Sequence, residues 1–257
     1  AYADDTFLTV EAETEDALKI RLEEEGKEVL RFFSSNELIA NPGKTGLLVI
    51  RPGARGDGKE LQMSLGGATV TEKDEEKILG VHIQSSLKFN KHVENLQLDL
   101  SYRIGILHRL RHTLGKKELK IIAEGIIMSK IRYCLSIYGV ESLHLKDNSP
   151  KPGLLNSLQV LQNDVARIIT GHKRKDHVRI NDLLSETNMM SINRILGYTL
   201  LMDNWKAINL GIPILEDILV KKQVGRMTLR SESCGQVAPQ TEEPFAMVSA
   251  KLWNGAS

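Results

Sequence analysis

The stretch from Lys77 to Leu96, KILGVHIQSSLKFNKHVENL, joins two different sequence patterns and so decides the fold. Before Ser86, apolar and β-branched residues come in short runs that are typical of strands. From Phe89 to Leu114, apolar residues recur every three or four positions, which is the period of an amphipathic helix. We therefore predict an α+β segment followed by an α-helical module, with a boundary near residue 86.

Several elements are expected on each side of this boundary. A helix is predicted from Thr14 to Phe33, where an apolar stripe ends at the polar residues Ser34, Ser35 and Asn36. Short strands are predicted at 7–10, 38–40, 47–50, 61–65, 68–71 and 78–83, with a hairpin turn at 66–67. After the boundary, further helices are predicted at about 116–138, 154–170 and 190–209.

Positive charge is concentrated in the middle of the chain, although the net charge of all 257 residues is only +1. Residues 1–80 hold 10 Lys and Arg against 17 Asp and Glu, a net charge of −7. Residues 81–180 hold 17 against 8, a net of +9, and residues 181–257 hold 7 against 8, a net of −1. Such a basic segment indicates a polyanionic partner such as nucleic acid, although a solvated helical face would give a milder version of the same count.

Composition sets further bounds on the class of protein. Hydrophobic residues make up 41% of the chain and charged residues 26%, which is ordinary for a globular protein. The two cysteines, Cys134 and Cys234, lie too far apart for a zinc or redox motif, and such sparse cysteine indicates an intracellular setting. No stretch reaches 18 consecutive apolar residues, so no membrane partner is expected.

Two adjacent carboxylates, Asp4 and Asp5, stand in an otherwise apolar run. At about 6 Å and an effective dielectric constant near 20, they repel each other by roughly 3 kcal/mol. A β-turn in which water screens the charges would offset this repulsion, because Asp favours turns. A divalent cation such as Mg²⁺ would offset it as well, because that ion takes hard oxygen ligands. Both interpretations stay open on these residues alone.

The order of the motifs resembles the reverse transcriptases of non-LTR, LINE-type retrotransposons. YADD (2–5) is similar to their motif C, NELIANPGKTGLLVI (36–50) to motif D, and KILGVHIQSSLKFNKHVENL (77–96) to motif E and the start of the thumb. RIGILHRLRHTL (103–114), SKIRYCLSIYG (129–139), LNSLQVLQNDVARIITG (155–171) and SAKLWN (249–254) resemble the helical region that follows the palm in jockey-like elements. The resemblance implies a partial polymerase palm at 1–85, a helical thumb at 86–145, a helical post-thumb region at 154–224 and a weakly structured tail at 225–257.

The resemblance implies an RNA-directed DNA polymerase that extends a DNA primer on an RNA template with dNTPs. In such an enzyme two Mg²⁺ ions activate the primer 3′-hydroxyl and neutralise the pyrophosphate leaving group. Asp4 then corresponds to the stronger metal ligand and Asp5 to the supporting one. Lys44 corresponds to a motif D lysine proposed as general acid, although an exposed turn lysine would explain it equally well.

Further residues acquire nucleic-acid roles through the same resemblance. Leu79, Gly80 and Val81 correspond to part of the primer grip, where glycine permits close approach of the backbone; a plain strand with a turn glycine is the alternative. The candidate phosphate contacts of the thumb are Arg103, Arg109, Arg111, Lys116 and Lys117. The cluster HKRK (172–175) would bind phosphates, act as a nuclear localisation patch, or form a solvated loop without a function.

The resemblance also implies parts that are not found in these 257 residues. They are the motif A aspartate, the motif B helix and the fingers, which precede motif C in the family. We therefore expect the isolated chain to hold Mg²⁺ weakly and not to polymerise, as a fragment of a mobile element's reading frame or a decayed copy. The alternative is a degenerate or domesticated protein that binds nucleic acid without catalysis. A nuclear location or a cytoplasmic ribonucleoprotein particle is expected, and the oligomeric state is left open.

Overall fold

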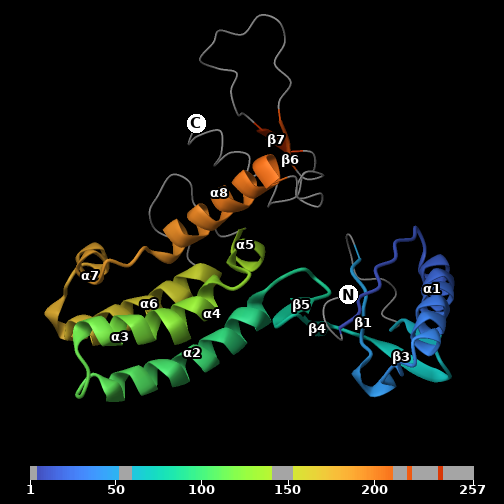
Figure 1. Cartoon of the computed structure of the whole chain (residues 1–257), viewed down its shortest axis with the longest axis horizontal. Coiled ribbons are helices and arrows are strands. Elements are labelled where there is room, and N and C mark those ends of the chain that lie inside the picture. Colours follow the sequence, from blue (N-terminus) through green and yellow to red (C-terminus); the bar gives the residue numbers. More distant parts are fainter. Residues whose placement is uncertain (1–4, 52–59, 141–152, 211–218, 222–236, 240–257) are drawn as a thin grey trace, which may run out of the picture. The chain divides into compact units, whose positions relative to one another are not determined.

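The computed structural model describes residues 5–51, 60–140, 153–210, 219–221 and 237–239, and its fold is α+β (Figure 1). The chain divides into two compact units, residues 1–91 and residues 92–257, which are described separately. The predicted α+β class is therefore confirmed, with most strands in the first unit and most helices in the second. The division into palm, thumb, post-thumb region and tail stays a prediction.

The first unit packs one long helix, α1 (Glu15–Ser35), against a three-stranded sheet. Thr14 ends the preceding loop as N-cap, since its Oγ1 accepts a hydrogen bond from the Ala17 amide at 3.3 Å. The strands are β1 (Leu47–Leu48), β2 (Gln62–Leu65) and β3 (Ala68–Lys73), in the order β1-β3-β2. β2 and β3 form an antiparallel hairpin through the predicted turn at 66–67, whereas β1 runs parallel to β3.

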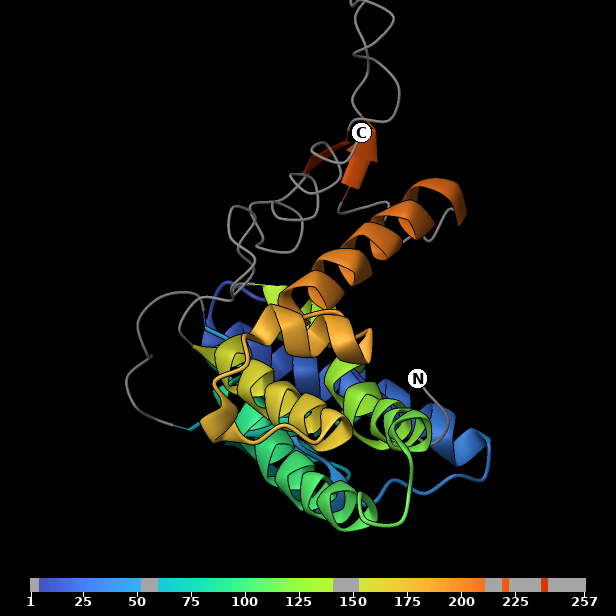
Figure 2. The same cartoon turned by 90° about the vertical axis from the view of Figure 1, so that its left-hand side faces the viewer.

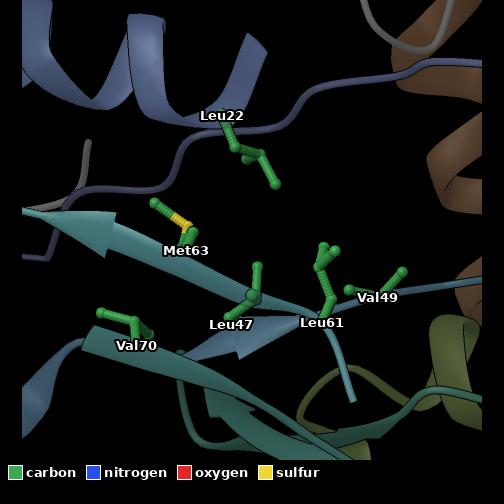
Figure 3. Close-up of a cluster of buried hydrophobic side chains, with 6 residues drawn as sticks. All are labelled: Leu22, Leu47, Val49, Leu61, Met63 and Val70. Carbon is green, nitrogen blue, oxygen red and sulfur yellow. The ribbon is translucent and has the colours of Figure 1, made fainter. Parts of the chain in front are cut away.

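A small apolar core lies between α1 and this sheet (Figure 3). In Figure 3 Leu22 points from the helix toward side chains that come from β1, β2 and β3 and the residues beside them. The buried members are Leu22, Leu47, Val49, Leu61, Met63 and Val70. Alternate positions of β2 are exposed and buried, as expected for a sheet with only one covered face.

A second hairpin follows, formed by β4 (Glu75–Ile78) and β5 (Val81–Gln84). The single strand predicted at 78–83 was wrong, because the chain reverses at Leu79 and Gly80, whose φ angles are 46° and 85°. Positive φ at both central residues is the geometry that matches a two-residue turn to the twist of its strands.

Two other predicted strands, 7–10 and 38–40, are also wrong, since neither run has a strand assignment. A short apolar run becomes a strand only with a ladder partner, and Ile39 is instead 96% exposed.

The second unit is mainly helical, and α2, the α3–α4 helix and α6 run side by side in both views (Figures 1 and 2). Its elements are α2 (Asn90–Leu110, which begins in the first unit), α3 (Lys116–Ala123), η2 (Glu124–Met128), α4 (Ser129–Arg132), α5 (Leu135–Tyr138), α6 (Leu154–Thr170), η4 (Arg174–Asp176), α7 (Ile180–Thr187), α8 (Ile192–Leu210), β6 (Leu219–Lys221) and β7 (Val237–Pro239). Its largest fully buried side chains are Leu100, Leu107, Ile127, Met128, Ile131, Leu135, Leu155, Leu158, Leu183, Ile192, Leu196 and Leu200. None of the described helices is long and apolar enough to cross a membrane.

The helix predicted at 116–138 is interrupted in two places. A π-helical segment, η2, separates α3 from α4, and Cys134 adopts a left-handed conformation with φ of 55° before α5 begins. The short helix α7 was not predicted at all, because its eight residues give too few turns for a clear period.

A buried amide network joins α6 to the start of α8. Gln159 donates from Nε2 to Gln162 Oε1 at 2.8 Å and to Asn163 Oδ1 at 2.9 Å. Gln159 Oε1 accepts from the Ile192 amide at 2.9 Å, and Gln162 Nε2 donates to the Met190 carbonyl at 2.8 Å. These bonds compensate for burying polar groups, and they fix the α7–α8 connection on α6.

An ion cluster ties the first sheet to α1. The Arg51 guanidinium binds Glu72 on β3 (Nη2 to Oε2, 2.8 Å) and Glu15 on α1 (Nε to Oε1, 2.6 Å). Glu72 also accepts a hydrogen bond from the Leu61 amide at 3.0 Å. The Arg51 hydrogen bond lowers the pKa of the Glu72 carboxyl, against the opposing effect of its burial, and the pKa of Arg51 is raised in turn.

We expect Glu72→Gln to destabilise the first unit by about 1–3 kcal/mol near neutral pH, because it removes a charge-assisted hydrogen bond. Since the folded-state pKa of Glu72 lies below its ordinary value of 4.5, its stabilisation is complete above that pH and is lost as the pH falls through the folded-state pKa. Amide hydrogen exchange of Leu61 between about pH 3 and pH 7 measures this dependence. The matched control is Glu24→Gln on the exposed side of α1; equal pH dependence in Glu72→Gln and the native chain would contradict the assignment.

Candidate nucleic-acid interface

The structure describes one of the two carboxylates predicted to bind metal. Asp5 is exposed, and Asp4 lies outside the described residues. Among the residues that the structure describes, no group of three or more His, Cys, Asp or Glu side chains could hold a metal ion. The predicted metal roles of Asp4 and Asp5 stay predictions.

Lys44 ends a short turn, η1 (Pro42–Lys44), and its side chain is exposed. Asn41 organises this turn: its Oδ1 accepts from the Gly43 amide, and its carbonyl accepts from the Lys44 amide, both at 3.0 Å. Asn commonly forms turns in this way, so the local sequence is accounted for by the turn. The general-acid role of Lys44 stays a prediction.

The predicted primer-grip residues occupy the tip of the β4–β5 hairpin, in two different environments. Leu79 and Gly80 form the exposed turn, whereas the Val81 side chain is only 4% exposed. At this tip, Leu79 and Gly80 are therefore exposed to solvent, and the Val81 side chain belongs to the interior. Gln84, at the end of β5, accepts a hydrogen bond through Oε1 from the Lys91 amide in the first turn of α2 (3.3 Å), which links the hairpin to that helix.

The predicted phosphate contacts on α2 also differ in their surroundings. The Arg103 guanidinium pairs with Asp99 one turn earlier at 3.0 Å, so its charge is already compensated within the helix. Arg109 is exposed in the last turn, and Arg111 is half-buried just beyond it. No ion pair of Arg109 or Arg111 is found within the described parts of the chain.

Two lysines begin α3, next to the α2–α3 turn. Lys116 Nζ lies 3.0 Å from Glu186 Oε1 on α7, and Lys117 is exposed, with no ion pair among the residues described. Lys120, one turn further, donates to the Asn188 carbonyl at 3.1 Å and so attaches α3 to the end of α7. We call Arg109, Arg111, Lys116 and Lys117 the α2–α3 basic surface.

The HKRK segment lies in the α6–α7 loop, residues 171–179, which two contacts anchor to helices and one internal hydrogen bond orders. Arg174 binds Asp164 on α6 (Nη2 to Oδ2, 2.6 Å). Asp176 Oδ2 accepts from the Lys173 amide at 2.7 Å and caps η4. His172 Nε2 lies 3.1 Å from Glu186 Oε2. These contacts order the loop, and most of its residues are exposed to solvent, so the interpretation as a solvated loop without a function stays open.

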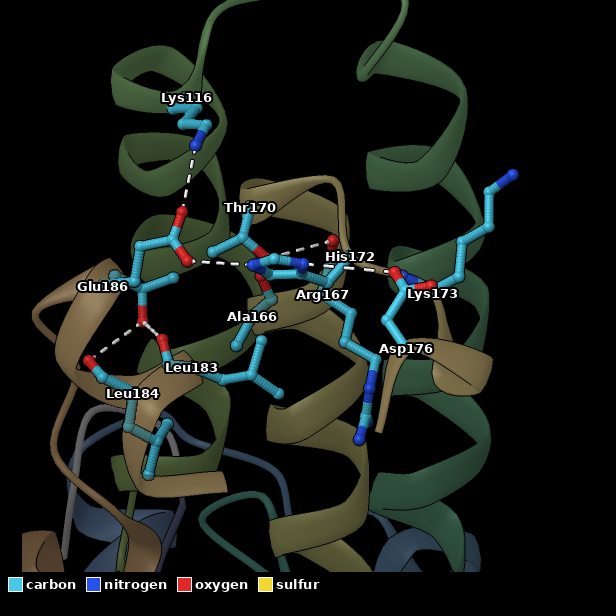
Figure 4. A network of polar contacts seen from close by, with 11 residues as sticks. Lys116, Ala166, Arg167, Thr170, His172, Lys173, Asp176, Leu183, Leu184 and Glu186 are labelled. Atoms are coloured by element: carbon cyan, nitrogen blue, oxygen red, sulfur yellow. Dashed lines mark hydrogen bonds and ion pairs between the residues drawn. The ribbon is translucent and has the colours of Figure 1, made fainter. Parts of the chain in front are cut away.

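Glu186 joins the loop to α3, as Figure 4 shows. Its two carboxylate oxygens contact different side-chain nitrogens, those of Lys116 and His172. These two hydrogen bonds, that from Lys116 foremost, lower the pKa of the Glu186 carboxyl. Sequence reasoning missed Glu186, because its partner Lys116 lies 70 positions earlier and no local pattern connects the two residues.

The hairpin tip provides a test of its backbone geometry. Gly80→Ala places a side chain at φ of 85° and should destabilise the hairpin by about 1–2 kcal/mol. Gly105→Ala makes the same chemical change inside α2, where a Cβ would meet nothing within 4 Å, and should stabilise by about 0.5–1 kcal/mol. Amide hydrogen exchange in each unit measures both effects; a Gly80→Ala variant as stable as the native chain would refute the turn geometry.

No family model matches this sequence, and neither a curated protein nor a solved structure matches it.

Proposed function

We propose that this chain is the C-terminal palm and thumb part of an RNA-directed DNA polymerase of a non-LTR retrotransposon, and that its helical unit binds the template–primer duplex. The observation that carries the proposal is the α2–α3 basic surface, whose four residues lie at the end of α2, in the turn after it and at the start of α3. Nucleic-acid phosphates are the partner that such point charges fit, and contacts of this kind fix position without reading sequence.

The catalytic part of the proposal depends on the first unit. In the complete polymerase, Asp4 and Asp5 would share two Mg²⁺ ions with a motif A aspartate, and these ions would supply the nucleophile activation and the charge neutralisation. Lys44 would be placed to protonate the pyrophosphate, and the exposed tip at Leu79 and Gly80 would approach the primer strand. What supports this part is the order of the motifs and the exposure of Asp5, Lys44 and the hairpin tip.

Binding can be tested with a fluorescently labelled RNA–DNA heteroduplex and the full chain. Reversing two exposed charges, Arg109→Glu with Lys117→Glu, should weaken binding roughly tenfold or more near 0.1 M salt and lower the slope of log K against log salt by about 2. The matched control reverses Lys19 and Lys27, two exposed lysines on α1, with the same change of net charge. Equal weakening by both pairs would show a net-charge effect and contradict a defined surface.

Catalysis needs a different experiment, because the chain by itself is expected to be inactive. Primer extension on an RNA template with Mg²⁺ would compare the chain with a form lengthened at its N-terminus through a motif A aspartate. We expect incorporation only by the longer form, and its loss in Asp4→Asn, because the metal site needs all three carboxylates. Incorporation by the shorter chain would refute the expected dependence on motif A. No incorporation by either form, with salt-sensitive binding retained, would favour a non-catalytic nucleic-acid-binding protein.

A further inference from the structure

Two basic segments that are far apart in the sequence meet on the helical unit. The α6–α7 loop carries HKRK at 172–175, and α3 begins with Lys116 and Lys117. Glu186 joins them, because one of its oxygens lies 3.0 Å from Lys116 Nζ and the other 3.1 Å from His172 Nε2. Figure 4 shows Lys116 and His172 on different sides of this one carboxylate.

The basic residues of the α6–α7 loop are of two kinds: some form contacts that anchor the loop, and others are exposed without an ion pair among the described residues. Arg174 is held by Asp164, and His172 by Glu186, so both serve to fix the loop. Lys173 and Lys175 are exposed, and no ion pair of either is found among the described residues. In Figure 4 the Lys173 ammonium extends away from the network. A loop that is already ordered presents such lysines at a lower entropic cost than a mobile one.

Glu186 occupies the place where an anion would bind. Lys116 Nζ and His172 Nε2 converge on the two oxygens of one carboxylate, and a phosphate group also presents more than one acceptor oxygen to such donors. The pair is accessible to solvent, since the Lys116 side chain is 65% exposed and that of Glu186 39% exposed. Ion pairs as exposed as this one contribute little to stability, so a phosphate can displace the carboxylate at small cost.

We propose that Lys173 and Lys175 extend the α2–α3 basic surface into one phosphate-binding surface, and that Glu186 is a built-in counter-ion which the nucleic-acid backbone must displace from Lys116 and His172. This inference rests on the proposed nucleic-acid binding and adds a second segment and a regulatory carboxylate to it. A nucleic-acid backbone fits better than an acidic protein segment, because the surface continues the α2–α3 basic surface and offers lysine and arginine charges at several points along it.

The test uses the same labelled RNA–DNA heteroduplex and the full chain. Glu186→Gln should tighten binding about three- to tenfold near 0.1 M salt and steepen the salt slope by about one, because one more phosphate is neutralised. Lys173→Glu with Lys175→Glu should weaken binding roughly tenfold or more and reduce the slope by about 2. The control for the first variant is Asp182→Asn, which makes the same charge change at an exposed position of α7.

The outcomes separate this inference from the function on which it rests. If the native chain does not bind the heteroduplex at all, the proposed function fails. If Arg109→Glu with Lys117→Glu weakens binding but the two loop lysines have no effect, the extended surface is refuted alone. If Asp182→Asn tightens binding as much as Glu186→Gln, the effect is one of net charge and the counter-ion role is refuted. Thermal unfolding of each variant establishes that α7 stays folded, and the loop double variant breaks none of the anchoring ion pairs.

Discussion

The arrangement of the helical unit depends on the burial of three amide side chains on one helix, α6. Gln159, Gln162 and Asn163 are almost fully buried, and a buried amide without a partner costs about 1–3 kcal/mol. Two of the amides are satisfied only when the segment at 190–192 lies against α6, because the Met190 carbonyl and the Ile192 amide complete their hydrogen bonds. This requirement places the end of α7 and the start of α8. With α7 in this position, Glu186 lies next to Lys116 and also contacts His172 of the α6–α7 loop.

Some basic residues of this unit form ion pairs with carboxylates and stabilise the fold, whereas others have no such partner among the described residues and could contact a ligand. Two of the basic residues are held in ion pairs that stabilise local structure, Arg103 with Asp99 and Arg174 with Asp164. The net charge of +9 in residues 81–180 therefore indicates attraction to a polyanion, but it does not identify the residues that a polyanion would contact. The available charge lies at the α2–α3 turn and on the α6–α7 loop, where the nearest carboxylate, Glu186, sits on an exposed pair. Local geometry, more than the charge count, decides which cations can meet a phosphate.

The sequence predicts those features whose causes are local. The α+β class and α2 follow from a change of hydrophobic period, and the β2–β3 turn follows from two consecutive glycines. It does not predict Glu186, or the exclusion of 38–40 from the sheet, because both depend on partners far along the chain. The basic residues of the candidate site could be found from composition and motif. The i, i+4 spacing of Asp99 and Arg103 already allows their pairing, and the structure shows that this pair forms and that Arg109 is exposed.

The β4–β5 turn shows a mismatch between a residue and the backbone conformation that it adopts. A two-residue turn with positive φ at both positions favours Asn followed by Gly, and here Leu79 occupies the first position at φ of 46°. A branched apolar residue in this conformation costs about 1–2 kcal/mol, which Asn would largely avoid. Leu79 is 39% exposed, so the hairpin covers more than half of its surface, and this burial offsets part of the cost. The pairing of β4 with β5 therefore imposes the turn conformation on Leu79 against the preference of this residue, and the partial burial of its side chain helps to make that conformation tolerable.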